Sequence, residues 1–436
     1  MKCGLMAAKS KPEVCSLHIF YIHLHLYNMI EKSKIKNFPH MNRPHLIPKE
    51  LTSEIKGRIT RIQKKMQEKN IDAMLVSSNV NLFYTTGRFF RGYVYIPIIG
   101  DAIYFIIRPQ IYHEDDNTLT IRKPEQISDK LEEIGFGIPQ KIALEEDVLT
   151  FSDYRRLAAI FSKSEKENGS PTLRDVRMVK TPYELDQMHI DADHHVKVYR
   201  RIPELYKEGM TDLDLQIEIE RELRKEGCLG YPRVAGHLMD INLGSVLVGE
   251  NADNPSPYDF AMGGMGIDPS LPGGANGTII KEGVTVMIDM NGAFNGYQTD
   301  MTRVWSLGEL PDKAVFAHKC SLEILRTLED LGRPGIPVSD LYMKAEEIVR
   351  QWHLEDYFMG YSQKAAFIGH GVGIELNEQP PITSRNKTLL KENMTLALEP
   401  KFVIPEVGAV GSENTYAVKP RGLECLTVFD EEIMKL

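Results

Sequence analysis

The chain has 436 residues, of which 42% are hydrophobic and 26% are charged, and its formal net charge is −9. One ordinary core does not accommodate this length, so two or three domains of a globular protein are expected. The negative charge argues against the basic surface with which proteins bind DNA or RNA, so no nucleic-acid partner is expected.

The cysteines favour a reducing compartment. Their number is odd, their spacings are wide and no CxxC motif occurs, which argues against a disulfide framework and a cysteine zinc site. The five are Cys3, Cys15, Cys228, Cys320 and Cys425. No apolar run has the length needed to span a bilayer. We therefore expect a cytoplasmic protein with no membrane partner.

Residues 1–48 are expected to form an N-terminal extension outside the folded core. The apolar stretch Val14–Ile30 is interrupted by polar residues and lacks a small-residue cleavage site, which is not typical of a signal peptide. Its histidines at positions 18, 23 and 25 match no closed metal site. The extension is either disordered or precedes the functional start, which would be Met29 or Met41.

Residues 50–178 predict a small α/β domain, because helical and strand patterns alternate there. Apolar residues recur at helical spacing over Thr52–Lys69, and Asn70 is expected to end that helix. Strands are expected at 72–77, 93–98, 102–107 and 141–144, with another helix at 127–134.

Residues 179–436 are expected to form the second domain. A long helix over Thr181–Leu205 joins the two halves, with Thr181 as its N-cap and Pro182 in its first turn. Residues 249–277 are dense in Gly, Pro, Asn and Asp, so they are expected to be mostly loop. Further helices are expected near 314–328 and 338–351.

A hairpin is predicted over Val284–Trp305, where two β-rich runs flank Asn295-Gly296. A two-residue turn there places Asn291 opposite Asp300 and Asp289 opposite Thr302. The two aspartates then share one face as diagonal neighbours, roughly 7–8 Å apart at the backbone. They are either ligands of a shared cation or solvated acids on an exposed face, and the hairpin alone does not decide between these.

Three residues further along the chain are candidate ligands of the same ions. His370 is bracketed by glycines in GHGVG, Glu399 ends an apolar run before Pro400, and Glu413 follows a glycine-containing strand. Each also has a simpler interpretation: a hydrogen-bonded core histidine, a paired acid and a surface glutamate. Together with Asp289 and Asp300 they form an oxygen-rich set that suits Mn²⁺, Co²⁺, Zn²⁺ or Fe²⁺.

These motifs resemble those of the pita-bread metallopeptidase family, which includes methionine aminopeptidase, aminopeptidase P, prolidase and creatinase. The resemblance rests on IDMNGAFNGYQTDMTR, GHGVG, LEPKF and SENTYAV, in this order. The N-terminal half, through RITRIQKKMQEKNIDAMLVSSNVNLFYTTG, resembles the creatinase-type N-terminal domain, as VRMVKTPYELDQM does at the linker. Methionine aminopeptidases lack that domain, so aminopeptidase P and prolidase are the nearer relatives.

The resemblance implies a fold, a metal centre and a substrate. It implies a creatinase-like α/β N-terminal domain and an α+β C-terminal domain with a curved antiparallel sheet, with helices outside and two divalent metal ions inside. Asp300 and Glu413 would bridge the ions, Asp289 would complete one site, and His370 and Glu399 the other. Glu399 would carry the proton in the hydrolysis of small Xaa-Pro peptides by a hydroxide held between the ions. A homodimer is also implied.

Three departures from the family pattern affect the residues that grip the peptide. The position of the family's second histidine is Asn377, in LNEQPP. No histidine occurs between His237 and His318, so the family's histidine before the hairpin is also missing. The position of its arginine, two residues before Glu413, is Gly411. His237 is either a substitute substrate-binding residue beside Asn377 or a structural loop histidine.

These observations leave three functional hypotheses. The first is an active Xaa-Pro aminopeptidase or dipeptidase with an unusual pocket, supported by the complete ligand set. The second is a hydrolase of another amide, as in creatinase, although creatinase-type members lose the metal ligands that this chain keeps. The third is a peptide-binding module without catalysis, which Asn377 and Gly411 favour.

Overall fold

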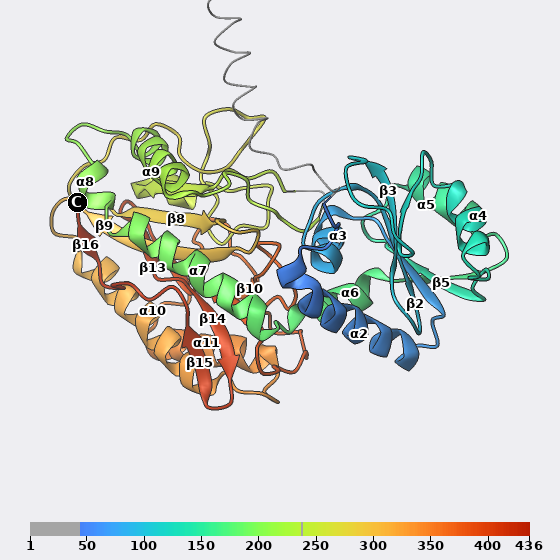
Figure 1. Cartoon of the computed structure of the whole chain (residues 1–436). Helices are drawn as coiled ribbons and strands as arrows, with labels where there is room; N and C mark the ends of the chain where they lie inside the picture. Colours follow the sequence, from blue (N-terminus) through green and yellow to red (C-terminus); the bar gives the residue numbers. More distant parts are fainter. Residues whose placement is uncertain (1–43, 237–238) are drawn as a thin grey trace, which may run out of the picture.

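The computed structural model describes residues 44–236 and 239–436, which form two lobes connected by a long helix (Figure 1). Most of the expected extension 1–48, with both candidate starts, lies outside the described residues, as does His237. In the part of the chain that is described, no helix combines the length and apolarity that crossing a membrane requires.

The N-terminal lobe is built on a six-stranded mixed sheet with the order β4-β3-β2-β1-β5-β6. Its strands are β1 (Ala73–Val76), β2 (Arg91–Pro97), β3 (Ile103–Arg108), β4 (Thr118–Thr120), β5 (Lys141–Leu144) and β6 (Glu165–Asn168). Its helices are η1 (Lys49–Leu51), α2 (Thr52–Glu68), α3 (Asn79–Thr86), α4 (Gln126–Glu133), α5 (Phe151–Ile160) and α6 (Ser170–Met178). The expected α/β class is confirmed, and α2 buries the apolar face that its sequence pattern predicted.

Helix α7 (Pro182–Tyr199) begins as predicted and ends earlier than predicted. The Thr181 hydroxyl accepts from the backbone N–H of Glu184, whose carboxylate accepts from the Thr181 N–H, so the first turn is closed by a capping box. The prediction of one helix through Leu205 is wrong, because the chain breaks at Arg200 and restarts as α8 (Ile202–Leu205). Pro203 is the physical reason, since it has no N–H to donate to the carbonyl four residues earlier.

The C-terminal lobe contains two four-stranded sheets and a two-stranded ribbon. The sheets have the orders β16-β9-β8-β7 and β10-β11-β14-β15, and β12 pairs with β13. The strands are β7 (Gly244–Val248), β8 (Val286–Gly292), β9 (Thr299–Ser306), β10 (Gly369–Gly371), β11 (Thr395–Leu398), β12 (Lys401–Ile404), β13 (Gly408–Gly411), β14 (Asn414–Lys419), β15 (Gly422–Cys425) and β16 (Met434–Lys435). The expected α+β lobe is therefore confirmed, and its strands form three separate sheets that are antiparallel except for the parallel pair of β9 with β16.

Helices cover this sheet system on several sides (Figure 1). The remaining helices are α9 (Asp212–Glu226), η2 (Gly249–Asp253), α10 (Asp312–Leu331) and α11 (Val338–Gln351). Helix α10 packs on β12, β13 and β15 and on α11, α7 packs on β8 and β9, and α9 packs on β7. As expected, the stretch 249–277 is mostly loop after η2, and the buried carboxylate of Asp212 holds it by accepting from the N–H groups of Asn276 and Gly277.

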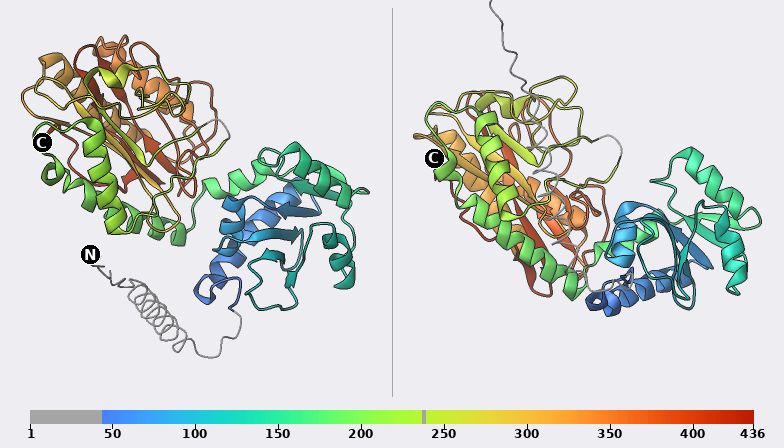
Figure 2. Two further views of the ribbon diagram at one scale, coloured as in Figure 1. Left: turned by 90° about the horizontal axis from the view of Figure 1, so that it is seen from above. Right: turned by 45° about the horizontal axis from the view of Figure 1, so that its top comes forward.

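The two lobes share buried contacts although they are separate in outline (Figure 2). Arg58 of α2 donates to the hydroxyl of Tyr297, at the tip of the β8–β9 hairpin, over 2.8 Å. Tyr297 in turn donates to Glu184 of α7 over 3.3 Å. One apolar cluster contains residues of the N-terminal lobe together with Tyr297, Val372 and Ile374. The N-terminal lobe therefore packs directly on the segments that carry the site.

We expect His318 to make the stability of the fold depend on pH. Its Nε2 donates to the carbonyl of Glu431 and its Nδ1 accepts from the N–H of Gly411, so the folded state uses the neutral ring. Burial lowers its pKa from 6.5 to about 4. Between these values the unfolded chain binds a proton that the folded chain does not, so stability falls as the pH falls through this window.

Urea denaturation of the wild type and His318→Gln at pH 7 and pH 5 measures this effect. His318 should account for a loss of about 2 kcal/mol at pH 5, from the shift of its titration alone. The variant should therefore lose less free energy of unfolding between the two pH values. An equal loss in both proteins would contradict the assignment.

Candidate metal centre

The β8–β9 hairpin brings the two aspartates together in the predicted register. Asn291 pairs with Asp300 and Asp289 pairs with Thr302, as the Asn295-Gly296 turn indicates. Gly296 adopts a φ of +94°, a conformation that glycine allows without steric cost. Asp300 is buried and Asp289 is partly exposed, so the hairpin presents one face to the interior of the lobe.

His370 lies on β10 with one ring nitrogen facing the acids. Its Nδ1 donates to the carbonyl of Gly371 over 3.0 Å, which leaves the lone pair on Nε2. That Nε2 lies 3.8 Å from Asp300 Oδ2 and 3.7 Å from Glu399 Oε1. These separations are too long for hydrogen bonds. The arrangement is the one in which a metal-binding histidine is oriented by a backbone carbonyl.

Glu399 and Glu413 reach the same space from the ends of β11 and β13. Both are buried. The hydroxyl of Thr302 donates to Glu413 Oε2 over 2.6 Å, whereas the buried Glu413 Oε1 has no hydrogen-bond partner among the described residues. An orphaned buried carboxylate oxygen is costly unless a cation compensates it.

The five predicted ligands form two overlapping groups whose donor atoms lie within 4.8 Å of one another. One group is Asp300, His370 and Glu413, and the other is Asp289, Glu399 and Glu413. The sequence therefore identified residues that converge in space, and their roles as ligands stay predictions.

The structure places a sixth residue, Lys401, at the centre of the second group. Its Nζ donates to Asp289 Oδ2 and Glu399 Oε2 over 2.8 Å each and to Glu413 Oε2 over 2.9 Å. The side chain is fully buried. An ammonium has three donors, and all three are used here.

The pKa values of Asp300 and Lys401 are both raised, which favours the neutral form of the acid and the charged form of the lysine. Burial raises the pKa of Asp300 well above its ordinary value, and the carboxylates of Glu413, Asp289 and Glu399 raise it further. Burial acts to lower the pKa of Lys401. The adjacent carboxylates of Asp289, Glu399 and Glu413 outweigh burial and hold that pKa well above its ordinary value. Lys401 is therefore a permanent positive charge at neutral pH, whereas Asp300 is left without a close cationic partner.

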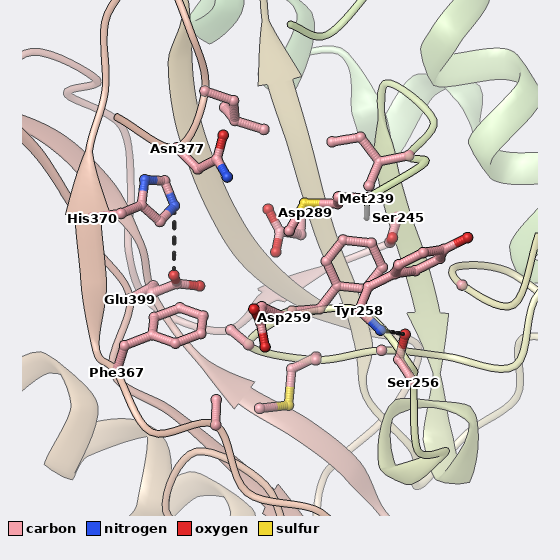
Figure 3. Close-up of a pocket in the computed structure, with 18 of the residues that line it drawn as sticks. Met239, Ser245, Ser256, Tyr258, Asp259, Asp289, Phe367, His370, Asn377 and Glu399 are labelled. Atoms are coloured by element: carbon pink, nitrogen blue, oxygen red, sulfur yellow. Dashed lines mark hydrogen bonds and ion pairs between the residues drawn. The ribbon is translucent and has the colours of Figure 1, made fainter. Parts of the chain in front are cut away.

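An open cavity of about 780 Å³ leads to these residues (Figure 3). Asp289, His370 and Glu399 line it, and Figure 3 shows His370 and Glu399 next to each other on one wall. Loop residues such as Tyr258 and hydrophobic side chains such as Phe367 form other parts of the wall. The volume is sufficient for a small peptide-sized ligand.

Asn377, predicted to bind substrate, lines the cavity and is also engaged within the protein. Its Oδ1 accepts from the N–H of Ala235 over 2.7 Å, and its Nδ2 lies 3.4 Å from the carbonyl of the same residue. Asn377 therefore connects the loop after β10 to the segment before position 237. His237, the other predicted substrate-binding residue, lies outside the described residues.

The structure also accounts for the glycine at position 411. Lys401 and Gly411 are direct partners across β12 and β13. Gly411 has a φ of +134°, and a Cβ there would lie 2.6 Å from the carbonyl oxygen of Pro400. A side chain at this position is excluded unless the ribbon moves, while the facing residue, Lys401, supplies a cation to the centre.

Comparisons with known proteins identify the family. A model of metallopeptidase family M24 matches residues 186–420, more than half of the chain. The chain belongs to metallopeptidase family M24. A model of the creatinase/prolidase N-terminal domain matches residues 58–179. Membership of this metallopeptidase family implies a divalent metal cofactor, and the cluster around His370 offers ligands for one.

Relatives within the family cover nearly the whole described chain. The chain is 25% identical to an Xaa-Pro dipeptidase of Pyrococcus furiosus over 384 residues, which is 87% of this chain and all of that protein. An Xaa-Pro dipeptidase structure from Bacillus anthracis superimposes with a TM-score of 0.72 at 21% identity, over 88% of this chain and all of that one. An X-Pro aminopeptidase structure from Thermotoga maritima gives 0.70 at 22% identity, over 87% of this chain and 99% of that one. The two structural likenesses establish the fold.

Lys401 is the functional residue that the sequence analysis missed. It stands in the same LEPKF motif that identified Glu399. Side chains two residues apart on an extended chain point to the same side, and this rule could have placed Lys401 beside Glu399. Its position within an apolar stretch, between Leu398 and Phe402, was a second signal.

We expect Asn377→Ala to lower the free energy of unfolding by about 1 kcal/mol, because the N–H of Ala235 loses its acceptor. Asn377→Asp keeps that acceptor and loses only the longer contact of Nδ2 with the Ala235 carbonyl, so its stability should lie between those of the wild type and Asn377→Ala. Urea denaturation of the three proteins measures the difference. Equal stability of Asn377→Ala and Asn377→Asp would show that the contact contributes nothing.

Proposed function

We propose that the chain is a metal-dependent hydrolase that cleaves Xaa-Pro bonds at the amino end of small peptides, as an aminopeptidase or dipeptidase. The observation that carries the proposal is the convergence of Asp300, His370, Glu399 and Glu413 at an open cavity in a chain of family M24. The names of relatives that span this chain, Xaa-Pro dipeptidase and X-Pro aminopeptidase, support the choice of substrate.

The donor set fits a divalent ion of the type expected from the sequence. Carboxylates with one imidazole suit Mn²⁺, Co²⁺, Zn²⁺ or Fe²⁺, and the unpartnered Glu413 Oε1 and the lone pair on His370 Nε2 supply donors. When bound, such an ion would act as a Lewis acid toward the scissile carbonyl.

The protein's own residues would bind the peptide and move the proton. The cavity holds the N-terminal residue of the substrate beside Asp289 and His370. Glu399 keeps one oxygen on Lys401 and presents Oε1 toward His370, where it can accept the proton of the attacking water and return it to the leaving proline nitrogen. A homodimer and a cytoplasmic location stay predictions from the sequence.

We expect Glu399→Gln to lower kcat by a factor on the order of 10²–10⁴, because the amide cannot accept the proton. The assay is release of the N-terminal residue from a panel of Xaa-Pro dipeptides and tripeptides with added Mn²⁺, Co²⁺ or Zn²⁺ and a chelated sample. Glu406→Gln is the matched control, since Glu406 is exposed in the turn between β12 and β13. Full activity of Glu399→Gln would reject its role, and no metal-dependent cleavage by the wild type would reject the peptidase.

We also expect a divalent ion to stabilise the fold through His370. A ligand present at 100 times its Kd raises the free energy of unfolding by about 2.7 kcal/mol. Thermal unfolding with and without Mn²⁺ should show this gain in the wild type and in His113→Ala, whose side chain is exposed. The gain should be much smaller in His370→Ala. The same gain in all three proteins would place the bound ion elsewhere.

A further inference from the structure

We infer that the ammonium of Lys401 takes the place of one of the two metal ions expected from the sequence, so that each chain binds a single divalent ion. The inference rests on the proposed function, because it concerns the same metal centre. It makes Lys401 a built-in cation of the site and a positioning residue for Glu399.

The first argument is the position of the ammonium. Nζ is held within 2.9 Å by oxygens of Asp289, Glu399 and Glu413, and these three residues are one of the two candidate ligand groups. A metal ion in this group would need the oxygens to which Lys401 donates. The two cations exclude one another, because they compete for the same lone pairs and repel at contact distance.

The second argument is that Lys401 has no alternative place. Its side chain is fully buried, and a lysine that left this position would lose three hydrogen bonds and leave the carboxylates without their cation. Met359 packs next to it, since the backbone N–H of Lys401 lies 3.4 Å from the Met359 sulfur, and Phe402, which follows it, is fully buried. The ammonium is therefore fixed where the carboxylates are.

The third argument is that the other ligand group keeps unused donors. The two carboxylate oxygens of Glu413 differ in their contacts. Oε2 accepts hydrogen bonds from Lys401 and Thr302, whereas Oε1 has no partner among the described residues. His370 Nε2 lies 3.7–3.8 Å from carboxylate oxygens of Asp300 and Glu399. Donors that each bind one ion at about 2.0–2.2 Å can be separated by such distances. One position for an ion remains, formed by Asp300, His370 and Glu413, and Glu399 Oε1 lies beside it.

In this arrangement the two carboxylate oxygens of Glu399 have different partners. Oε2 is held by Lys401 and Oε1 faces His370, so the lysine fixes the rotation of the carboxylate. Lys401 thereby positions Glu399 without contact with the substrate.

Metal content and manganese spectroscopy on the full chain test the inference. Purified protein is saturated with Mn²⁺, freed of excess ion and measured by inductively coupled plasma mass spectrometry. We expect one Mn²⁺ per chain and a six-line electron paramagnetic resonance spectrum of an isolated ion. Two ions per chain with an exchange-coupled spectrum, as expected for ions roughly 3.5–4 Å apart, would overturn the inference.

Lys401→Gly is the variant that separates the two groups of ligands. Without the ammonium, the three carboxylates are free to bind a second ion, so the content should rise from one to two and the spectrum should become coupled. Lys391→Gly, which removes an exposed lysine, is the matched control and should stay at one ion. A folded Lys401→Gly that still binds one ion would contradict the inference. If this variant does not fold, the wild-type spectrum decides.

The same samples distinguish this inference from the proposed function. One ion with cleavage of Xaa-Pro peptides supports both. One ion without cleavage supports the inference and rejects the peptidase. Two ions with cleavage reject the inference and support the peptidase. A wild type that binds no Mn²⁺ would overturn the inference and the metal dependence together.

Discussion

The close approach of four carboxylates, three of them buried and Asp289 partly exposed, is the constraint on which the centre depends. Asp289, Asp300, Glu399 and Glu413 converge from separate strands, and their mutual repulsion in a poorly solvated interior has to be offset by positive charge. Lys401 supplies part of this charge through three hydrogen bonds. The rest of the lobe holds the strands in the register that places the carboxylates around Lys401 and beside the cavity.

The surrounding polar contacts keep the ligand-bearing segments in place. Thr302, opposite Asp289 on the hairpin, donates to Glu413, and the N–H of Glu413 lies 3.2 Å from the carbonyl of Thr302. Behind the loop that follows His370, the buried carboxylate of Glu378 accepts from Arg177 and Lys180 at the boundary between the lobes. Groups outside the set of candidate ligands therefore help to fix the backbone from which those ligands project.

The sequence predicted the parts of this site that depend on local rules. The Asn295-Gly296 turn determines the strand register, and the register places Asp289 and Asp300 on one face; the glycines around His370 and the proline after Glu399 are equally local signals. Lys401 was missed because two of its three partners, Asp289 and Glu413, lie 112 and 12 residues away in the sequence. The end of α7 was misjudged for a simpler reason, since the helical pattern continues through Pro203, where a backbone hydrogen bond cannot. The partner of Asn377, a backbone amide 142 residues away, has no signature in the sequence at all.

The contact between Arg58 and Tyr297 bears on whether the two lobes can fold independently. Seen as a ribbon the chain separates into two lobes, yet the hairpin that carries both aspartates ends in the apolar cluster of the N-terminal lobe (Figure 2). Cutting the chain near residue 180 and removing the N-terminal lobe would expose Tyr297 and Ile374 to water. It would also leave the buried carboxylate of Glu184 without its guanidinium partner, Arg58. The two lobes are therefore expected to unfold together. The C-terminal lobe, which holds the candidate ligands, depends for part of its stability on the N-terminal lobe, which contributes none of them.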